Sequence, residues 1–321
     1  MRFVVYGAGA IGGVVGARLF QSGHEVVLIA RGAHYEAIRD KGLRIQSPAD
    51  DETLPIPVVD HPSRLTLTGD DVVFLAMKSQ DTIGACDALE ACAPPDIAVA
   101  CFQNGVENER VVLRHYAGTY AVCVMSPTSH VDPGVVIAQS APVGGLFDIG
   151  CYPHGLDARA EEIAVALNAS TFHSVPRADV MRWKYTKLLM NLANSIEATI
   201  TPDPDVKDLV RQVRAEGEDT LRAAGIEFAS REEDKERRGD RMHVQPVNGE
   251  MRGGGSSWQS LARSTRSIEA DYLNGEIVTL GRLHGVPTPA NALMQRIANA
   301  QARVGAPPQS VPVAEVLSEL R

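Results

Sequence analysis

Three glycines near the start of the chain have a spacing that suits the binding of phosphate. They belong to a run that fits the pattern G-x-G-x-x-G, namely Gly7-Ala8-Gly9-Ala10-Ile11-Gly12. In such a run the first glycine permits a tight turn, the second lets the backbone approach a pyrophosphate, and the third lets a helix pack closely on a strand. The start of the following helix offers free N–H groups and a dipole that favours an anion. Between a strand and a helix, the run predicts a dinucleotide site.

The residue that ends the next expected strand bears on which dinucleotide binds. An NAD site usually places Asp or Glu about 20 residues after the glycines, where the carboxylate bonds the ribose 2′-hydroxyl. This chain has Arg31 there. Its fixed charge and planar fork of donors suit a 2′-phosphate. We therefore expect NADP(H) rather than NAD(H), although a solvated arginine at a strand end is the alternative.

A second polar group lies within an otherwise apolar stretch of the second half. Lys187, Asn191 and the adjacent pair Asn194 and Ser195 recur at helical spacing, so they share one face. The neighbouring residues are apolar nearly all round, which predicts a buried helix. Because buried polar groups are costly unless paired, we expect this stripe to line a cleft or to meet a partner. The alternative is a lysine that reaches solvent with satisfied amides behind it.

Two further polar residues follow expected strands. Lys78 comes directly after the strand expected at 71–76, and Asn104 follows the strand expected at 97–102. Ligands of open parallel sheets bind beyond the carboxyl ends of the strands, so both positions suit a cofactor. Lys78 could equally be solvated, and Asn104-Gly105 could equally be a simple turn.

Strands and helices must alternate in the first half to position these groups. Apolar runs predict strands at 2–6, 26–29, 71–76, 97–102 and 120–125, with helical patterns between them. Such alternation is typical of a parallel sheet with right-handed crossovers. Two β-rich runs within 135–149 indicate that the sheet ends in antiparallel strands.

The second half has a different pattern. Helices are expected at 180–200, 206–224, 256–283 and 289–304, and no clear strand signal follows residue 175. The charged stretch 231–255 ends in three glycines and reads as a mobile loop. The sequence therefore predicts an α/β Rossmann-like N-terminal domain at 1–178 and an all-helical C-terminal domain at 179–321, with a cleft between them.

Composition excludes several classes of protein. The formal net charge of −9 argues against nucleic acid as a partner. No stretch approaches the roughly 20 apolar residues of a membrane span, and the N-terminus has no signal-peptide pattern. The five cysteines lack metal-like spacing, so we expect free thiols in a reducing cytoplasm and no metal site. The sequence leaves a homodimer open.

Taken together, these features resemble the ketopantoate reductase (2-dehydropantoate 2-reductase) family. The resemblance covers the whole chain, and its motifs occur in the order that the family shows. These motifs are the glycine run, Arg31, Lys78, Gln103-Asn104-Gly105, Lys187-x-x-x-Asn191, Ser256-Ser257-Trp258-Gln259 and the run from Ile268 to Gly275. It implies an NADPH-dependent reductase of a small 2-oxo acid, with ketopantoate reduced to pantoate for pantothenate biosynthesis. It also implies an active site between a nucleotide-binding domain and a helical domain.

The resemblance also implies residue roles in the helical half. Lys187 would be the proton donor and Asn191 a substrate contact, while Ser257 would bind the substrate carboxylate. Glu269 would lie at the mouth of the cleft, in contact with cofactor or substrate. From the residues alone, Glu269 could be a helix-surface acid paired with Arg266, and Ser257 could be a helix N-cap.

In the cofactor half, the resemblance implies that Asn104 holds the nicotinamide ribose region. Lys78 and Arg31 would bind the adenosine end.

Two positions that touch substrate in the family differ here. The family often has a second Asn where this chain has Ser195, and an Asn where it has Gly254. These differences put the identity of the 2-oxo acid in question more than the reaction type. The alternatives are a 3-hydroxy acid dehydrogenase and a non-catalytic NADPH-binding regulator.

Overall fold

The chain folds into two compact units. The computed structural model describes residues 1–320. The first unit comprises Met1–Met181 and Arg231–Arg252, and the second comprises Arg182–Ser230 with the residues from Gly253 onward. The first unit thus takes up a segment that the sequence analysis assigns to the helical domain.

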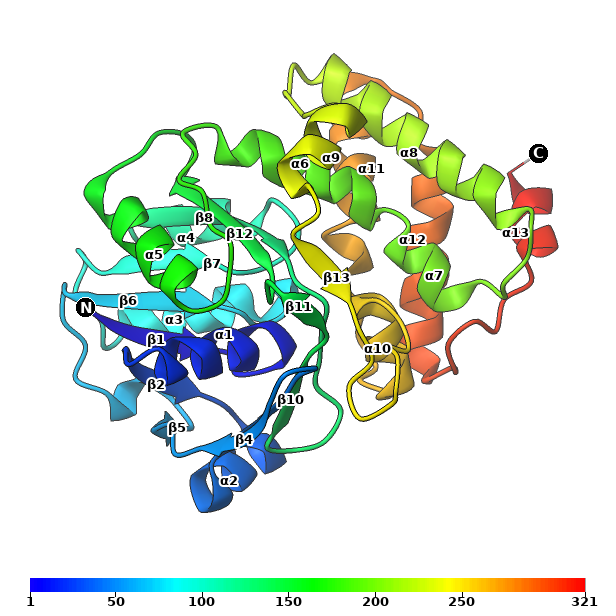
Figure 1. The fold of residues 1–321 in the computed structure, drawn as a ribbon. Coiled ribbons are helices and arrows are strands. Elements are labelled where there is room, and N and C mark those ends of the chain that lie inside the picture. Colours follow the sequence, from blue (N-terminus) through cyan, green and yellow to red (C-terminus); the bar gives the residue numbers. More distant parts are fainter. Residues whose placement is uncertain (321) are drawn as a thin grey trace. The chain divides into compact units, whose positions relative to one another are not determined.

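A mostly parallel sheet forms the centre of the first unit (Figure 1). Its strand order is β12-β8-β7-β6-β1-β2-β5, and only β12 runs antiparallel, against β8. The expectation that this sheet ends in an antiparallel strand is thus confirmed by β12. The strands are β1 (Arg2–Tyr6), β2 (Glu25–Ile29), β5 (Val58–Val59), β6 (Asp71–Leu75), β7 (Ala98–Cys101), β8 (Thr119–Met125) and β12 (Leu146–Cys151).

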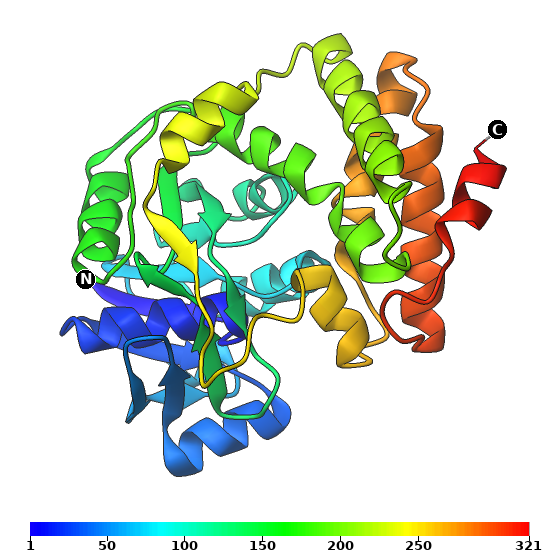
Figure 2. The ribbon, with the colours of Figure 1, turned by 45° about the vertical axis from the view of Figure 1, so that its right-hand side comes forward.

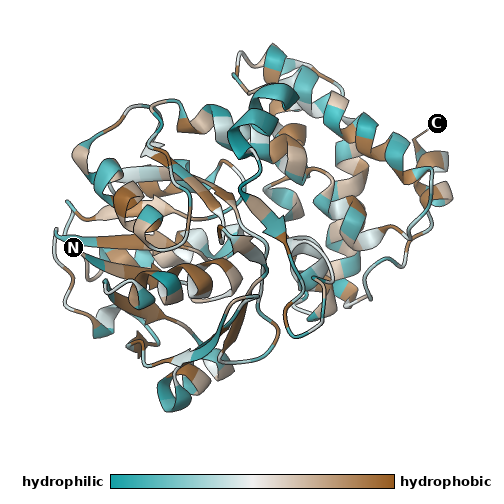
Figure 3. Ribbon diagram, viewed as in Figure 1, coloured by the Kyte–Doolittle hydropathy of each residue, from teal (hydrophilic) through white to brown (hydrophobic). Residues whose placement is uncertain are grey.

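Side-chain alternation along the strands produces two apolar layers. On β1, Phe3 and Val5 join one core cluster, and Val4 joins the other. The first layer includes Val15 of α1, and the second includes Leu89 of α3. Apolar residues mark these strands in Figure 3. The helices and 3-10 turns of this part are α1 (Ala10–Gln21), α2 (Gly32–Lys41), η1 (Pro62–Arg64), η2 (Ser79–Asp81), α3 (Thr82–Glu90), α4 (Asn108–Leu113) and α5 (Ala158–Ala169).

A second, four-stranded sheet packs against α1. Its order is β4-β3-β10-β9, formed by β3 (Leu43–Gln46), β4 (Asp51–Leu54), β9 (Thr128–Ser129) and β10 (Val135–Ala138). The stretch 48–70, expected to be loop with an edge strand or two, supplies β4 and β5.

Part of the segment that returns from the second unit is regular, so the expectation of a loop at 231–255 was wrong for that part. It forms α9 (Arg231–Arg238) and β13 (Met242–Val244). β13 pairs antiparallel with β11 (Ser140–Pro142), and the two strands lie side by side in Figure 2. A strand therefore does follow residue 175.

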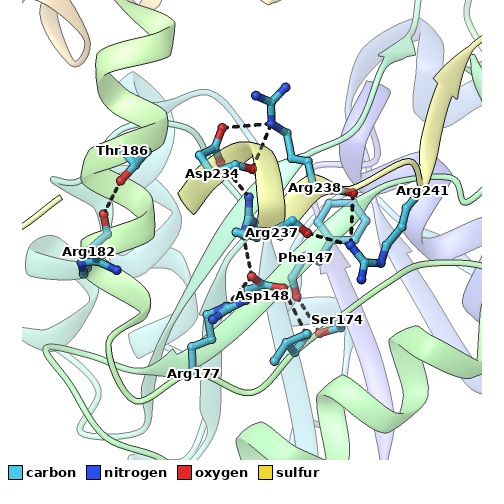
Figure 4. Close-up of polar contacts among 11 residues, drawn as sticks. Phe147, Asp148, Ser174, Arg177, Arg182, Thr186, Asp234, Arg237, Arg238 and Arg241 are labelled. Atoms are coloured by element: carbon cyan, nitrogen blue, oxygen red, sulfur yellow. Dashed lines mark hydrogen bonds and ion pairs between the residues drawn. The ribbon is translucent and has the colours of Figure 1, made fainter. Parts of the chain in front are cut away.

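Buried charges hold α9 on the first unit (Figure 4). The Arg237 Nε donates to the Asp148 carboxylate on β12 at 2.7 Å, and Arg177 donates to the same oxygen at 2.6 Å. Asp234 pairs with Arg237 and with Arg238 on the same helix. The side chains of Arg237 and Asp148 are 4% and 2% exposed. Removal of one partner from such a pair leaves the other charge buried and unpaired, which costs about 3–5 kcal/mol.

The second unit is helical, as expected. Its helices are α6 (Val180–Asn191, shared with the first unit at its start), α7 (Asn194–Thr199), α8 (Val206–Ala223), α10 (Ser256–Ala262), α11 (Asn274–His284), α12 (Pro289–Val304) and α13 (Val313–Glu319), with the 3-10 turn η3 (Glu269–Asp271). α8 approaches α6 closely at Gly217, where an added Cβ would lie 2.7 Å from Leu192 and 2.8 Å from Leu189.

Two expected helices are interrupted in the second unit. The pattern at 180–200 predicts one helix, but α6 ends at Asn191 and α7 begins at Asn194. The pattern at 256–283 is likewise divided into α10, η3 and α11. Within residues 1–320, the helices are too short or too polar to cross a bilayer. All five cysteines are free.

Candidate functional site

The polar groups expected to bind a cofactor lie at one edge of the first unit's sheet. β7, β6, β1 and β2 are adjacent and parallel. Their carboxyl ends lead, in that order, to Asn104, Lys78, the glycine run and Arg31. The topology therefore brings together all the cofactor residues expected from the sequence, including Ala8, Ala10 and Ile11 of the run.

The three glycines of the run meet different surroundings. Gly7 has a φ of +99°, and a Cβ there would lie 2.7 Å from the Met77 nitrogen. A Cβ on Gly12 would lie 2.2 Å from the Gly7 oxygen. Gly9 differs, because its φ is −73° and a Cβ would have no protein atom within 4 Å. The fold thus requires glycine at 7 and 12, whereas Gly9 leaves open space beside the start of α1.

Arg31 lies where the sequence places it, two residues beyond the end of β2 and at the N-cap of α2. Its side chain is 83% exposed, and its guanidinium contacts the Asp81 carboxylate at 3.2 Å. An exposed pair of this kind contributes little to stability, so Arg31 remains available to an anion.

A buried network that the sequence did not reveal fixes the turns after β6 and β7. The Asn108 Nδ2 donates to the Ser79 hydroxyl at 3.1 Å and to the Asn104 carbonyl at 3.0 Å. The Asn108 Oδ1 accepts from Thr82, whose hydroxyl accepts in turn from Gln103. Asn108 is 1% exposed. It therefore couples the turn that carries Lys78 to the turn that carries Asn104.

In the second unit, Lys187 and Asn191 lie four residues apart on α6, and Asn191 is its last residue. Asn191 is 4% exposed and Lys187 is half-buried. Both take part in interactions within the chain. Ser195 lies beyond the interruption, on α7, where its hydroxyl donates to the Leu192 carbonyl at 3.2 Å. The expected polar stripe is therefore divided by a backbone break.

Two buried asparagines maintain that break. The Asn274 Nδ2 donates to the Leu192 carbonyl at 3.1 Å and to the Asn291 Oδ1 at 3.0 Å. Asn291 donates to Glu216, whose carboxylate also accepts the backbone N–H groups of Ala290 and Asn291. Asn274 and Asn291 are both 0% exposed. The only sequence signal for this network is amide residues within apolar helical patterns.

Glu269 precedes Asn274 in the chain by one short turn. Glu269 begins η3 and is 4% exposed, and its carbonyl accepts from the Leu273 N–H one turn before Asn274. The alternative of a helix-surface acid paired with Arg266 is therefore wrong.

Ser257 is 3% exposed and is the second residue of α10, which packs against α7. Gly255 is the N-cap of α10, so the alternative of Ser257 as N-cap is wrong. Gly255 donates its N–H to the Glu197 carboxylate at 3.2 Å. The indole of Trp258 covers Gly254, where an added Cβ would lie 2.6 Å from the ring. A larger residue at 254 would require Trp258 to move.

Comparison with known proteins accounts for nearly the whole chain. The model of ketopantoate reductase PanE/ApbA matches residues 3–153, and the model of its C-terminal domain matches residues 179–302. The 2-dehydropantoate 2-reductase of Pyrococcus horikoshii is 27% identical over 95% of this chain and 99% of its own length. That of Caulobacter vibrioides is 28% identical over 93% and 98%.

Solved structures show the same fold. A PanE/ApbA family ketopantoate reductase from Ralstonia eutropha superposes with a TM-score of 0.77 at 28% identity, covering 95% of this chain and 99% of that one. A D-mandelate dehydrogenase solved with NADH and anilino(oxo)acetate gives a TM-score of 0.80 at 21% identity over the same shares. The chain belongs to the ketopantoate reductase PanE/ApbA family.

Proposed function

We propose that this protein is an NADPH-dependent reductase of a small 2-oxo acid, with 2-dehydropantoate as the first candidate and pantoate as its product. The observation that carries the proposal is the pair Lys187 and Asn191 on α6, within a chain that matches both family models. The relatives named as 2-dehydropantoate 2-reductases match 95% and 93% of the chain, which supports the same substrate class.

The residues of the first unit fit a dinucleotide. The open space at Gly9 suits a pyrophosphate beside the first N–H groups of α1. The exposed guanidinium of Arg31 suits a 2′-phosphate. Lys78 and Asn104 complete the edge and would bind the adenosine end and the nicotinamide ribose. NADPH supplies the hydride of the reaction when it is bound.

The second unit supplies the proton and holds the acid. Lys187 donates a proton from its ammonium group to the substrate carbonyl oxygen, and its charge stabilises the negative charge that develops there. Asn191 orients that oxygen, and Ser257 anchors the carboxylate. Ser195 is a further substrate contact, and Glu269 contacts cofactor or substrate. The reaction requires the hydride donor and Lys187 to reach the same carbonyl group.

A panel of oxo acids tests the proposal directly. NADPH oxidation is followed with 2-dehydropantoate, other branched 2-oxo acids, an aromatic 2-oxo acid and 3-oxo acids, and each is repeated with NADH. We expect turnover with 2-oxo acids and a preference for NADPH. Turnover with 3-oxo acids alone would favour a 3-hydroxy acid dehydrogenase. Tight NADPH binding without any turnover would favour a regulator.

A further inference from the structure

His34 connects the glycine run to a loop of the second sheet. Its Nε2 lies 2.7 Å from the Ala8 carbonyl oxygen within the run. Its Nδ1 accepts the backbone N–H of Gly134 at 2.9 Å. His34 lies on α2, and Gly134 precedes β10. One imidazole thus joins two backbone segments that are distant in sequence.

These two contacts determine the protonation state of His34. Because the Gly134 N–H donates to Nδ1, that nitrogen carries no proton, so Nε2 carries the proton and donates it to Ala8. A second proton on Nδ1 would face the Gly134 N–H and break that contact. Burial, followed by the neighbouring His130 ring, lowers the pKa of His34 to about 4, in agreement with a neutral ring. The two rings lie 4.1 Å apart, and the His130 Nδ1 donates to the Val135 carbonyl.

The bond to Ala8 also sets the direction of the next N–H group. In a trans peptide the C=O of one residue and the N–H of the next point in opposite directions. The Ala8 carbonyl points to His34, so the Gly9 N–H points away from it. Gly9 is the N-cap of α1 and has no side-chain cap. Its N–H belongs to the first turn, whose N–H groups lack acceptors within the helix.

We propose that His34, as a neutral imidazole, is a positioning residue of the cofactor site that orients the Ala8–Gly9 peptide so that the Gly9 N–H meets the pyrophosphate. The inference rests on the proposed function, because it requires a dinucleotide at the glycine run. His34 itself does not touch the cofactor in this role. It acts through the peptide that it holds.

Two substitutions by amide residues test the two hydrogen bonds of His34 separately, because each substitution preserves only one of them. In His34→Gln the side-chain nitrogen takes the place of Nε2 and can still donate to Ala8. In His34→Asn the shorter amide can accept from Gly134 but does not reach Ala8. The probes are NADPH and adenosine 2′-monophosphate, which contains the 2′-phosphate but no pyrophosphate. Binding constants, kcat at saturating NADPH and thermal midpoints are measured for both variants and the wild type.

We expect His34→Asn to raise the Kd for NADPH by about fivefold, the value of one hydrogen bond, and His34→Gln to stay within about twofold of wild type. The Kd for adenosine 2′-monophosphate and kcat at saturating NADPH should not change. Equal losses of NADPH affinity in the two variants, or no loss in either, would overturn the proposal. Failure of the wild type to bind NADPH would instead overturn the proposed function.

Discussion

In the first unit the backbone places the polar groups, whereas in the second unit buried side chains do so. Glycine turns and strand ends bring Gly9, Lys78 and Asn104 to one edge of the sheet. Around Lys187 and Asn191, the helix ends where the Asn274 side chain and the Ser195 hydroxyl both donate to the Leu192 carbonyl. The first arrangement follows from local motifs and topology. The arrangement in the second unit depends on buried side-chain amides, which must keep their hydrogen-bond partners.

This difference predicts that substitutions will affect different properties in the two units. Substitutions at the sheet edge should alter cofactor affinity. They should leave the fold intact wherever the new side chain has space. Changes in the amide network should lower stability even though they do not touch the substrate. Lys187 should be the exception in its unit, because the role proposed for it is chemical.

The largest effect is expected for Lys187→Ala. Loss of the proton donor should lower kcat by about 10²–10⁴. The Kd for NADPH should be unchanged, because Lys187 lies outside the glycine run and the sheet edge proposed to bind the dinucleotide. Lys207→Ala, which removes an exposed lysine of α8, is the matched control and should retain full activity. An active Lys187→Ala enzyme would show that another group donates the proton.

The amide network should be broken by Asn274→Asp, which keeps the shape of the side chain. A carboxylate cannot donate to the Leu192 carbonyl or to the Asn291 Oδ1, so acceptors would face one another in a site that is 0% exposed. We expect the free energy of unfolding to fall by about 3 kcal/mol. Urea denaturation measures it. Asp271→Asn, at an exposed position of η3, is the control, and an equal loss there would refute the role of the buried donors.

Cofactor choice should depend on Arg31. Substitution Arg31→Ala would remove the charge-assisted hydrogen bonds proposed to the 2′-phosphate and should raise the Kd for NADPH by about 10–100-fold. The Kd for NADH should change little, because NADH lacks that phosphate. Titration of both cofactors against both proteins measures the two changes. Equal weakening of NADPH and NADH would place Arg31 elsewhere in the site.

The glycines of the run allow a sharper test. Gly9→Ala adds a methyl group that meets no protein atom within 4 Å, so stability should be unchanged. The methyl would occupy the space proposed for the pyrophosphate, and the Kd for NADPH should rise by about tenfold, or 1.4 kcal/mol. Gly12→Ala should instead destabilise the fold, because its Cβ would lie 2.2 Å from the Gly7 oxygen. Unchanged NADPH binding in Gly9→Ala would contradict the placement of the pyrophosphate.

The sequence predicted the sheet edge well because each of its groups follows a strand with a strong apolar pattern. It did not predict the break after Asn191, since Leu192 and Ala193 are ordinary helix residues and the pattern continues through them. One of the two groups that donate to the freed carbonyl is Asn274, 82 residues later in the chain. Such a contact leaves no periodicity to detect.

The expectation of a loop in the segment Arg231–Arg252 was partly wrong for a similar reason. Its charged residues are typical of a solvated loop, but Arg237 is buried against Asp148, 89 residues away in sequence. The strands β13 and β11, which pair with each other, are even farther apart in the sequence. The local composition indicates an exposed segment. The cost of burying these charges is offset only by a partner such as Asp148, which is distant in sequence.

The smallest effect concerns Asp81, whose carboxylate contacts Arg31 at 3.2 Å. This carboxylate lies beside the site proposed for the 2′-phosphate and should repel it. Asp81→Asn should therefore lower the Kd for NADPH by about twofold to threefold at low salt, with stability within about 0.5 kcal/mol of wild type, because both side chains are partly or largely exposed. The gain should disappear at 0.5 M salt, where such interactions are screened.

Asp87→Asn on α3 removes the same charge from an exposed position and serves as the control. A gain confined to Asp81→Asn, and to NADPH rather than NADH, would place the 2′-phosphate next to Arg31. A similar gain in both variants would mean that only the net charge of the protein had been sensed. No gain in either would contradict this repulsion, and with it the placement of the 2′-phosphate beside Arg31. The contrast with the donor-dependent second unit would then rest on the glycine run and the amide network alone.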